Sequence, residues 1–415
     1  MKKMARVDHR GRALCAAVAV AALFSPVEGF AAGRSPSQAP VKAALEPDGR
    51  AEARLIGIYR MVGKANSHQV LEEARALVSD YPNFQLGQLV YGDLLMAHVR
   101  PPRVLGDVPA GLGADSPRLR ELRDESRLRL LALQERPPAD AVPAQFVSLS
   151  PRNKHAIAVD VSKARLYLLE NTPQGPRLIA DYYISVGKAG VGKNVEGDQR
   201  TPLGLYFITS NLDPKSLKDL YGSGALPINY PNALDVRRGK GGSGIWLHGT
   251  PSSQFSRAPL ATDGCVAVAN PDLERIIRTV EIRTTPVVIA KSLKWVGAKT
   301  IEPEKTELEG LLRSWAEAKT RNDAGRLMGF YAADFTADEK TLAAHAALRR
   351  GKPSGAKTRE TRLSDISLLR WTDEADVLVS TFGELATGEK SGRTIRQYWE
   401  RRKGQWKIVY EGVVG

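Results

Sequence analysis

Residues 246–250 read Trp-Leu-His-Gly-Thr, and residues 261–266 read Ala-Thr-Asp-Gly-Cys-Val. The first run closes an apolar stretch with His248, and the second closes a loop with Cys265, 17 positions later. The other cysteine of the chain, Cys15, lies close to its start. A cysteine without a disulfide partner is either an inert buried residue or a reactive one. The upstream histidine and the glycines beside both residues favour a reactive thiol.

Residues 1–31 are typical of a secretory signal peptide. Several basic residues precede a short apolar core at residues 13–24, and Gly29-Phe30-Ala31 offers the small residues that a signal peptidase needs. The core is shorter than the ~20 residues of a membrane-spanning helix. The sequence therefore predicts a chain exported to the periplasm or cell envelope, with no transmembrane segment after cleavage.

The mature chain keeps a large positive charge. Residues 1–31 hold five basic and two acidic residues, so their removal lowers the net charge from +14 to +11. Such a surplus can indicate nucleic acid or an anionic surface as the partner. The basic residues are scattered among acidic ones rather than gathered in a stripe with stacking aromatics, so we expect attraction to the anionic envelope and no nucleic-acid binding.

The order of patterns along the chain predicts an α+β multidomain protein. Residues 32–50 are rich in Pro, Ser, Gly and Ala and are predicted to be a disordered linker. Residues 51–137 carry apolar residues at helical spacing, which predicts a helical N-terminal domain. We expect this domain to serve packing, including a homodimer through its helices. Proline-containing linkers are predicted at residues 137–151 and 291–305.

Between these linkers, residues 152–291 alternate short β-branched and aromatic runs with turn residues. This pattern predicts a β-rich, mostly antiparallel domain with one helix at residues 272–279. The expected strands are 156–161, 165–169, 180–186, 205–208, 244–248 and 287–290. Residues 304–415 begin with helical patterns at 306–321, 324–331 and 338–349. Strand-like runs follow at 361–370, 375–385, 394–402 and 406–411, which describes an α+β cone.

A catalytic cysteine needs a nearby base, because the thiolate is the nucleophile. We expect His248 to be this base, which requires the strand ending at residue 248 and the loop ending at residue 265 to meet. The backbone amides of Asp263, Gly264 and Cys265 are then candidate donors to an oxyanion. Gly249 leaves room beside the imidazole.

These residues resemble the L,D-transpeptidase (YkuD-like) catalytic domain family, the cysteine enzymes of peptidoglycan cross-linking. The family signature is a histidine, a loop and then Ser/Thr-x-Gly-Cys, which here runs from His248 through Thr262 to Cys265. Ser185-Val186-Gly187 and Thr201-Pro202-Leu203-Gly204 also match, and the resemblance covers residues 154–290. It implies that Cys265 attacks a stem-peptide amide with His248 as base and the amides of Asp263 and Gly264 as oxyanion hole.

Two positions depart from this family. Asp263 stands where a histidine is common, and Ala267 stands where an arginine often binds an anionic substrate group. Arg257 and Arg238 are candidate replacements, as is Arg237. Together with Gly249, Thr250 and Thr262, residues Arg257 and Arg238 make up the expected substrate-binding set.

The C-terminal region resembles an NTF2-like domain, on the runs 331–335 (Tyr-Ala-Ala-Asp-Phe), Tyr398-Trp399 and 404–408 (Gly-Gln-Trp-Lys-Ile). The whole order of regions resembles cell-shape L,D-carboxypeptidases, which trim the wall tetrapeptide to a tripeptide with water as acceptor. We therefore predict an exported L,D-transpeptidase acting on peptidoglycan stem peptides through a Cys265 thioester. An L,D-carboxypeptidase is the alternative, and a non-catalytic wall-binding scaffold is the second alternative. No cofactor or metal is expected, because the histidines lack ligand spacing.

Overall fold

The computed structural model describes residues 49–107, 116–321, 323–337, 341, 345, 361–386 and 392–414. The chain divides into two compact units, Met1–Ser126 and Arg127–Gly415. The predicted signal peptide and nearly all of the predicted linker at 32–50 lie outside the described residues. No helix in the described ranges is long and apolar enough to cross a membrane.

The first unit is helical, as the spacing of its apolar residues predicts. Its helices are α2 (Arg50–Met61), α3 (Ser67–Asp80) and α4 (Gln85–Met96), and α5 (Pro117–Gln134) continues into the second unit. The Asn66 side chain caps α3 by accepting a hydrogen bond from the amide of His68. The helices α2, α3 and α4 bury the faces expected from the sequence, with Leu55 and Ile58, then Val70 and Leu77, then Leu86 and Val90.

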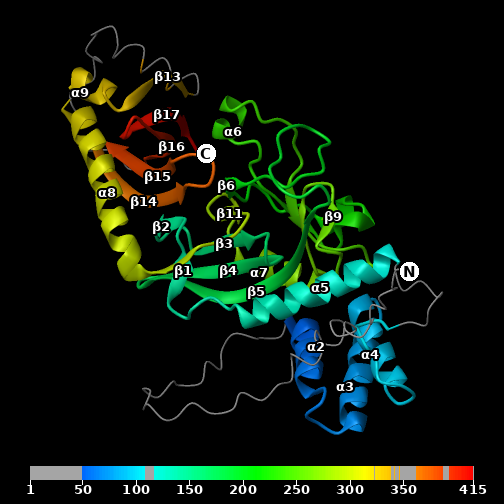
Figure 1. The fold of residues 1–415 in the computed structure, drawn as a ribbon. Helices are drawn as coiled ribbons and strands as arrows, with labels where there is room; N and C mark the ends of the chain where they lie inside the picture. Colours follow the sequence, from blue (N-terminus) through cyan, green and yellow to red (C-terminus); the bar gives the residue numbers. More distant parts are fainter. Residues whose placement is uncertain are drawn as a thin grey trace, which may run out of the picture. The chain divides into compact units, whose positions relative to one another are not determined.

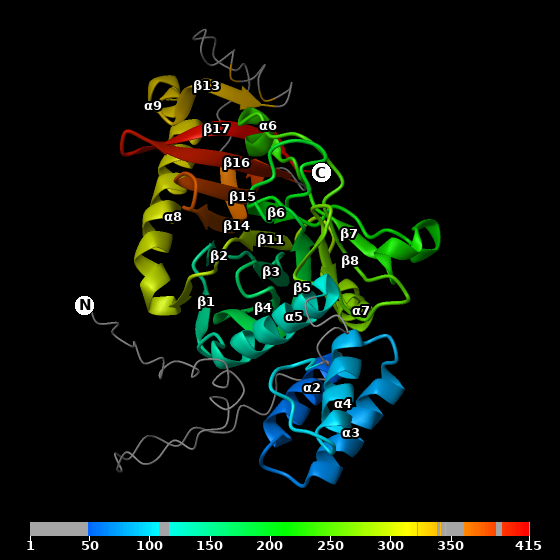
Figure 2. The same ribbon diagram turned by 45° about the vertical axis from the view of Figure 1, so that its right-hand side comes forward.

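The second unit contains a nine-stranded sheet in the order β6-β11-β3-β4-β5-β10-β8-β7, with β9 paired to β5 (Figures 1 and 2). Its strands are β3 (His155–Asp160), β4 (Arg165–Thr172), β5 (Gly175–Gly187), β6 (Gly204–Phe207), β7 (Ala225–Pro227), β8 (Trp246–His248), β9 (Leu260–Thr262), β10 (Val266–Val268) and β11 (Pro286–Ala290). Three pairs, β3–β11, β5–β9 and β8–β10, are parallel, so the sheet is more mixed than predicted. The short strands β7, β9 and β10 were not predicted.

Loops and short helices connect these strands. They include the 3₁₀ turns at Pro214–Ser216 and Asp219–Tyr221, α6 (Ala233–Arg237) and α7 (Asn270–Thr279). The helix α7 begins directly after β10, the strand that follows Cys265. Its Leu273 and Ile276 are fully buried in the apolar core of the sheet. This packing fixes the chain immediately after the cysteine loop.

The C-terminal domain consists of α8 (Ala298–Thr320), α9 (Ala324–Met328) and a curled sheet in the order β13-β17-β16-β15-β14-β2. Its strands are β13 (Tyr331–Ala337), β14 (Thr361–Trp371), β15 (Val377–Ala386), β16 (Arg393–Arg402) and β17 (Gln405–Val413). The helix α8 lies along the sheet (Figures 1 and 2) and buries Trp315 against Phe382. The helix predicted at 338–349 lies almost entirely outside the described residues.

The two predicted linkers contain strands instead. β1 (Ala141–Pro143) pairs with β12 (Trp295–Gly297), and β2 (Phe146–Ser148) pairs with β14 of the C-terminal sheet. Phe146 and Val147 are buried, which explains why this proline-containing segment is ordered. The central and C-terminal domains also share an apolar core that includes Phe146, Phe207 and Tyr398. The domains are therefore packed together rather than tethered.

Candidate active site

The pairing of β8 with β10 places Cys265 beside the strand that ends in His248. The two strands run parallel, with Val266 opposite Leu247 and Ala267 opposite His248. The Cys265 Sγ accepts a hydrogen bond from the amide of Trp246 at 3.4 Å and donates one to the carbonyl of Gly244 at 3.3 Å. The strand and the loop therefore meet, as the sequence analysis requires.

The His248 imidazole is buried and held by its own strand end. Its exposed fraction is 2%, and its Nδ1 lies 2.6 Å from the carbonyl oxygen of Gly249. Because a carbonyl only accepts, Nδ1 carries the hydrogen and Nε2 is the basic nitrogen. Burial, together with the smaller effect of the charge of Arg257, lowers the pKa of His248 to about 4, although the hydrogen bond to Gly249 opposes this shift. The imidazole is therefore neutral at pH 7.

The thiol of Cys265 is also neutral at rest. Burial raises the pKa of the thiol above its ordinary value, and the negative charge of Asp263 adds to this shift. The hydrogen bond from Trp246 and the charges of Arg257 and Lys193 oppose it. A neutral thiol next to a neutral imidazole is a nucleophile that needs general-base help at the moment of attack, rather than a preformed ion pair.

The cysteine loop is held by hydroxyl groups. Thr262 Oγ1 donates to the carbonyl of Cys265 at 2.6 Å and accepts from the amide of Gly264 at 3.1 Å. Thr201 Oγ1 donates to the carbonyl of Gly264 at 2.9 Å. The buried Thr262 hydroxyl therefore braces the loop, and its expected contact with substrate stays a prediction. The Gly264 amide is used within the loop and does not face outward as expected.

Gly264 itself is required by its backbone and by its neighbours. Its φ is +127°, which side-chain-bearing residues rarely adopt. A Cβ at this position would lie 2.7 Å from the carbonyl oxygen of Arg200. The glycine therefore lets the loop that precedes Thr201 approach the cysteine closely.

Asn270, which the sequence analysis did not single out, clamps the histidine end of β8. Its Oδ1 accepts hydrogen bonds from the amides of Thr250 and Ser223, both at 3.0 Å, and its Nδ2 donates to the carbonyl of Thr250 at 2.9 Å. A Cβ on Gly249 would lie 2.1 Å from the Asn270 Oδ1, so residue 249 must be glycine. Thr250 is buried in this clamp, and its hydroxyl donates to the carbonyl of Phe255.

The ring of Tyr221 lies against two residues of β8, namely His248 and the residue whose amide bonds the Cys265 sulfur. The ring of Tyr221 lies 5.2 Å from the imidazole of His248 and 4.8 Å from the indole of Trp246, measured between ring centroids. Burial raises the pKa of Tyr221, and the charge of Cys265 raises it further. Tyr221 precedes the Gly222–Ser223 turn that Asn270 holds, so the clamp also positions this ring.

The candidate arginines separate into two groups. Arg257 lies near the site, since its charge acts on the pKa values of both Cys265 and His248, and its side chain donates to the carbonyl of Ala261. Arg238 instead forms an ion pair with Glu400 of the C-terminal sheet at 3.2 Å. The charge of Arg238 is thus compensated by the C-terminal sheet, and its expected substrate-binding role stays a prediction.

Arg237 is likewise engaged at the domain boundary, where it pairs with Asp334. Asp263, whose amide is a candidate oxyanion donor, forms an exposed ion pair with Lys188 at 2.8 Å. Within the described residues, no group of three or more His, Cys, Asp or Glu side chains is arranged to hold a metal ion. Arg257 is therefore the member of the predicted arginine set that remains next to the cysteine.

Comparison with known proteins agrees with this architecture. Residues 154–289 match the L,D-transpeptidase catalytic domain family, and residues 307–412 match the Cds6 C-terminal NTF2-like domain family. The structure is similar to Bdellovibrio bacteriovorus Bd1075, at 26% identity and a TM-score of 0.56, over 66% of this chain and 98% of that one.

It is also similar to the helical cell shape determining protein Pgp2 from Campylobacter jejuni, at 23% identity and a TM-score of 0.52, over 64% of this chain and 95% of that one. A comparison with curated proteins found no match. The chain thus carries an L,D-transpeptidase catalytic domain followed by an NTF2-like domain, which confirms the predicted resemblance and fold class and supports an enzyme acting on peptidoglycan.

Proposed function

We propose that this protein is a cysteine L,D-transpeptidase that acts on peptidoglycan stem peptides. The observation that carries the proposal is the pairing of β8 with β10, which sets Cys265 beside the strand end that bears His248. The fixed Nδ1 of His248, bonded to the carbonyl of Gly249, supports Nε2 as the proton acceptor.

The reaction proceeds through a thioester. His248 Nε2 takes the Cys265 proton as the sulfur attacks the carbonyl carbon of the scissile L,D-amide. The amides of Asp263 and Cys265 donate to the resulting oxyanion, because the amide of Gly264 is bonded to Thr262. The carbon–nitrogen bond then breaks, and the departing amine takes its proton from the imidazolium. An amine of a second stem peptide attacks the thioester and gives its proton to His248 Nε2. The carbon–sulfur bond then breaks, and the imidazolium returns this proton to the departing Cys265 sulfur, which restores the thiol and the neutral imidazole.

Arg257 is the residue we assign to an anionic group of the substrate. It is half-buried, and burial lowers its pKa, so a compensating carboxylate would stabilise its charge. Substitution by glutamine is expected to raise KM more than it lowers kcat, because the contact is made in the ground state as well as in the transition state.

Water as the acceptor gives the second candidate, an L,D-carboxypeptidase. Ala267, at the position where an arginine is common in the family, is buried in β10 and offers no charge to an acceptor peptide. This feature favours hydrolysis of the thioester. A role in cell shape, as the name of Pgp2 describes for that protein, forms part of the same proposal.

The deciding experiment gives disaccharide tetrapeptides to the purified mature protein and measures products by mass spectrometry. Cross-linked dimers indicate the transpeptidase, and tripeptides with free D-alanine indicate the carboxypeptidase. Cys265→Ala and His248→Gln should both abolish turnover. His155→Gln is the matched control, because His155 is a partly buried histidine that pairs with Glu281 at 3.2 Å. Unchanged substrate with retained binding would instead favour the wall-binding scaffold.

Export is proposed from the signal-like residues 1–31 alone. Cell fractionation should find the protein in the periplasm, with a mature chain that starts near residue 32. A full-length chain recovered from the cytoplasm would contradict this part of the proposal.

A further inference from the structure

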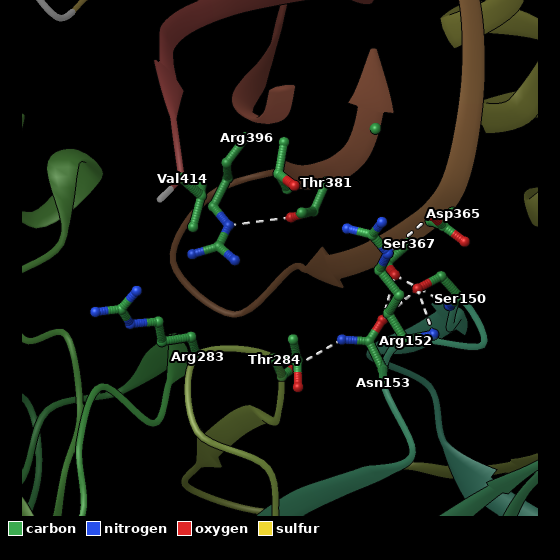
Figure 3. Close-up of a pocket in the computed structure, with 12 residues that line it drawn as sticks. Ser150, Arg152, Asn153, Arg283, Thr284, Asp365, Ser367, Thr381, Arg396 and Val414 are labelled. Carbon is green, nitrogen blue, oxygen red and sulfur yellow. Dashed lines mark hydrogen bonds and ion pairs between the residues drawn. The ribbon is translucent and has the colours of Figure 1, made fainter. Parts of the chain in front are cut away.

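A cavity of about 110 Å³ lies where the central domain meets the C-terminal sheet (Figure 3). The central domain contributes Ser150, Arg152, Asn153, Arg283 and Thr284, and strands β14, β15 and β16 contribute most of the other lining residues. A water molecule needs roughly 10–15 Å³ of such space, so the cavity has room for a small organic group. Nothing in the proposed reaction uses this cavity.

The cavity contains a buried guanidinium for which the described part of the chain supplies no counterion. Arg396 of β16 is 8% exposed, its Nε donates to Thr381 Oγ1 at 3.0 Å, and its guanidinium carbon lies 3.3 Å from the centre of the Phe207 ring. Across the ranges that the structure describes, no carboxylate lies within ion-pair distance of Arg396. Its neighbours are the hydroxyl of Thr381 and the phenol of Tyr398, which carry no negative charge at pH 7. A buried charge without a counterion is costly, so this arrangement is expected where an anion binds.

The other residues that line the cavity also favour a bound anion. Figure 3 shows Arg283 and Arg396 on one side of the cavity, and Arg152, Ser367 and Asn153 on the other. Arg152 is neutralised by Asp365 at 2.9 Å, which leaves Arg283 as a second positive charge. Arg283 has a φ of +70°, an unfavourable backbone conformation for a non-glycine residue. The lining therefore carries positive charge that its own carboxylate does not balance.

We propose that this cavity binds a carboxylate group, held by the Arg396 guanidinium and the Thr381 hydroxyl. The planar guanidinium presents paired donors that match the two oxygens of a carboxylate. The side chain of Val414 and the ring of Phe207 lie beside these donors, and they suit the short apolar chain of an organic acid better than a phosphate. The carboxylate could belong to a free amino acid or to a wall peptide. Only the second source rests on the proposed function.

Binding is tested by calorimetric titration of the full chain carrying Cys265→Ala, which prevents turnover. The probes are sodium acetate, D-alanine, inorganic phosphate and a disaccharide tetrapeptide. Acetate and D-alanine should bind, and Thr381→Val and Arg283→Gln should each weaken binding about tenfold, a change of about 1.4 kcal/mol. Arg313→Gln, which removes an exposed arginine from α8, is the matched control and should bind as the parent does.

The arms of the experiment separate the two sources of the carboxylate. Tetrapeptide binding that is weakened by Arg283→Gln supports a wall peptide, and binding of the free acids alone supports a small metabolite. Phosphate binding without acetate binding overturns the proposal, as does equal affinity in the pocket variants and the Arg313→Gln control. If Arg396→Lys fails to fold, the other two pocket variants still decide. Turnover of the wild-type chain is a separate measurement, so failure of the reaction and failure of this site are distinguishable.

Discussion

Replacement of Asn270 by alanine is the sharpest test of how the site is positioned. The substitution removes three hydrogen bonds of 2.9–3.0 Å that join the amides of Ser223 and Thr250 and the carbonyl of Thr250 to one side chain. Each such bond contributes about 1 kcal/mol net. The free energy that orders the His248 end of β8 should therefore fall by about 3 kcal/mol.

If this ordering positions the imidazole, kcat/KM for D-alanine release should fall about a hundredfold, since 1.36 kcal/mol corresponds to a factor of ten. The acid limb of the pH profile should also move. Burial holds the pKa of His248 at about 4, and a loosened Asn270→Ala site admits water, so this pKa should rise toward its ordinary value near 6.5. The measurement is kcat/KM between pH 4 and 8.

Asn171→Ala is the matched control, because Asn171 also donates to backbone carbonyls, at Ser150 and Leu149, outside the site. It should lower the free energy of unfolding without moving the acid limb. Asn270→Asp keeps the acceptor for the two amides and loses the donor to Thr250, so an intermediate kcat/KM is expected. The reasoning is refuted if Asn270→Ala loses stability while kcat/KM and the acid limb stay at their wild-type values.

Three further predictions concern the same loop and its base. The pKa of His248 is about 4 in the folded chain and near 6.5 in the unfolded chain, so the unfolded chain binds more protons between these pH values. The free energy of unfolding therefore falls as pH falls from 6.5 to 4. In urea unfolding the wild type should lose about 3 kcal/mol more than His248→Gln over this range, and an equal loss in both proteins would contradict the argument. Because burial raises the pKa of Cys265, its alkylation by iodoacetamide should accelerate about tenfold per pH unit from pH 7 to 9, and a plateau near pH 7 would instead reveal a resting ion pair. Gly264→Ala should lower the free energy of unfolding by at least about 2 kcal/mol and abolish D-alanine release, because φ at this residue is +127°; calorimetry that shows an unchanged melting temperature would argue against the strain.

The long strands of the C-terminal domain were predictable from the sequence. The runs predicted at 361–370, 375–385, 394–402 and 406–411 form β14 to β17 with shifts of a few residues, because each strand spans nine residues or more and carries β-branched or aromatic residues. The three-residue strands β9 and β10 were missed, since two or three residues carry no detectable period. The cysteine loop between them, rather than the strand preference of their own residues, sets how β9 and β10 pair with β5 and β8.

Two errors had a common cause, namely contacts between residues distant in sequence. Residues 137–151 were predicted to be a linker, although Phe146 and Val147 offered an apolar signal. Asn270 was missed because its partner Ser223 lies 47 residues earlier, a proximity that only the folded sheet creates. The pair of Cys265 and His248, by contrast, was proposed from residue type and spacing alone, and its catalytic role stays a prediction.

The pairing of β2 with β14 has a consequence for how the chain is made. Phe146 and Ser148 lie opposite Leu369 and Leu368, so the partner of Ser148 is synthesised 220 positions later in the chain. At translation rates of 5–20 residues per second this segment waits roughly 10–40 s before its partner leaves the ribosome. During that interval Phe146 and Val147 have no sheet to cover them. During synthesis the chain therefore exposes a short apolar strand that a holding chaperone is expected to bind. Synthesis of the C-terminal domain then supplies β14, and pairing of β2 with β14 displaces the chaperone.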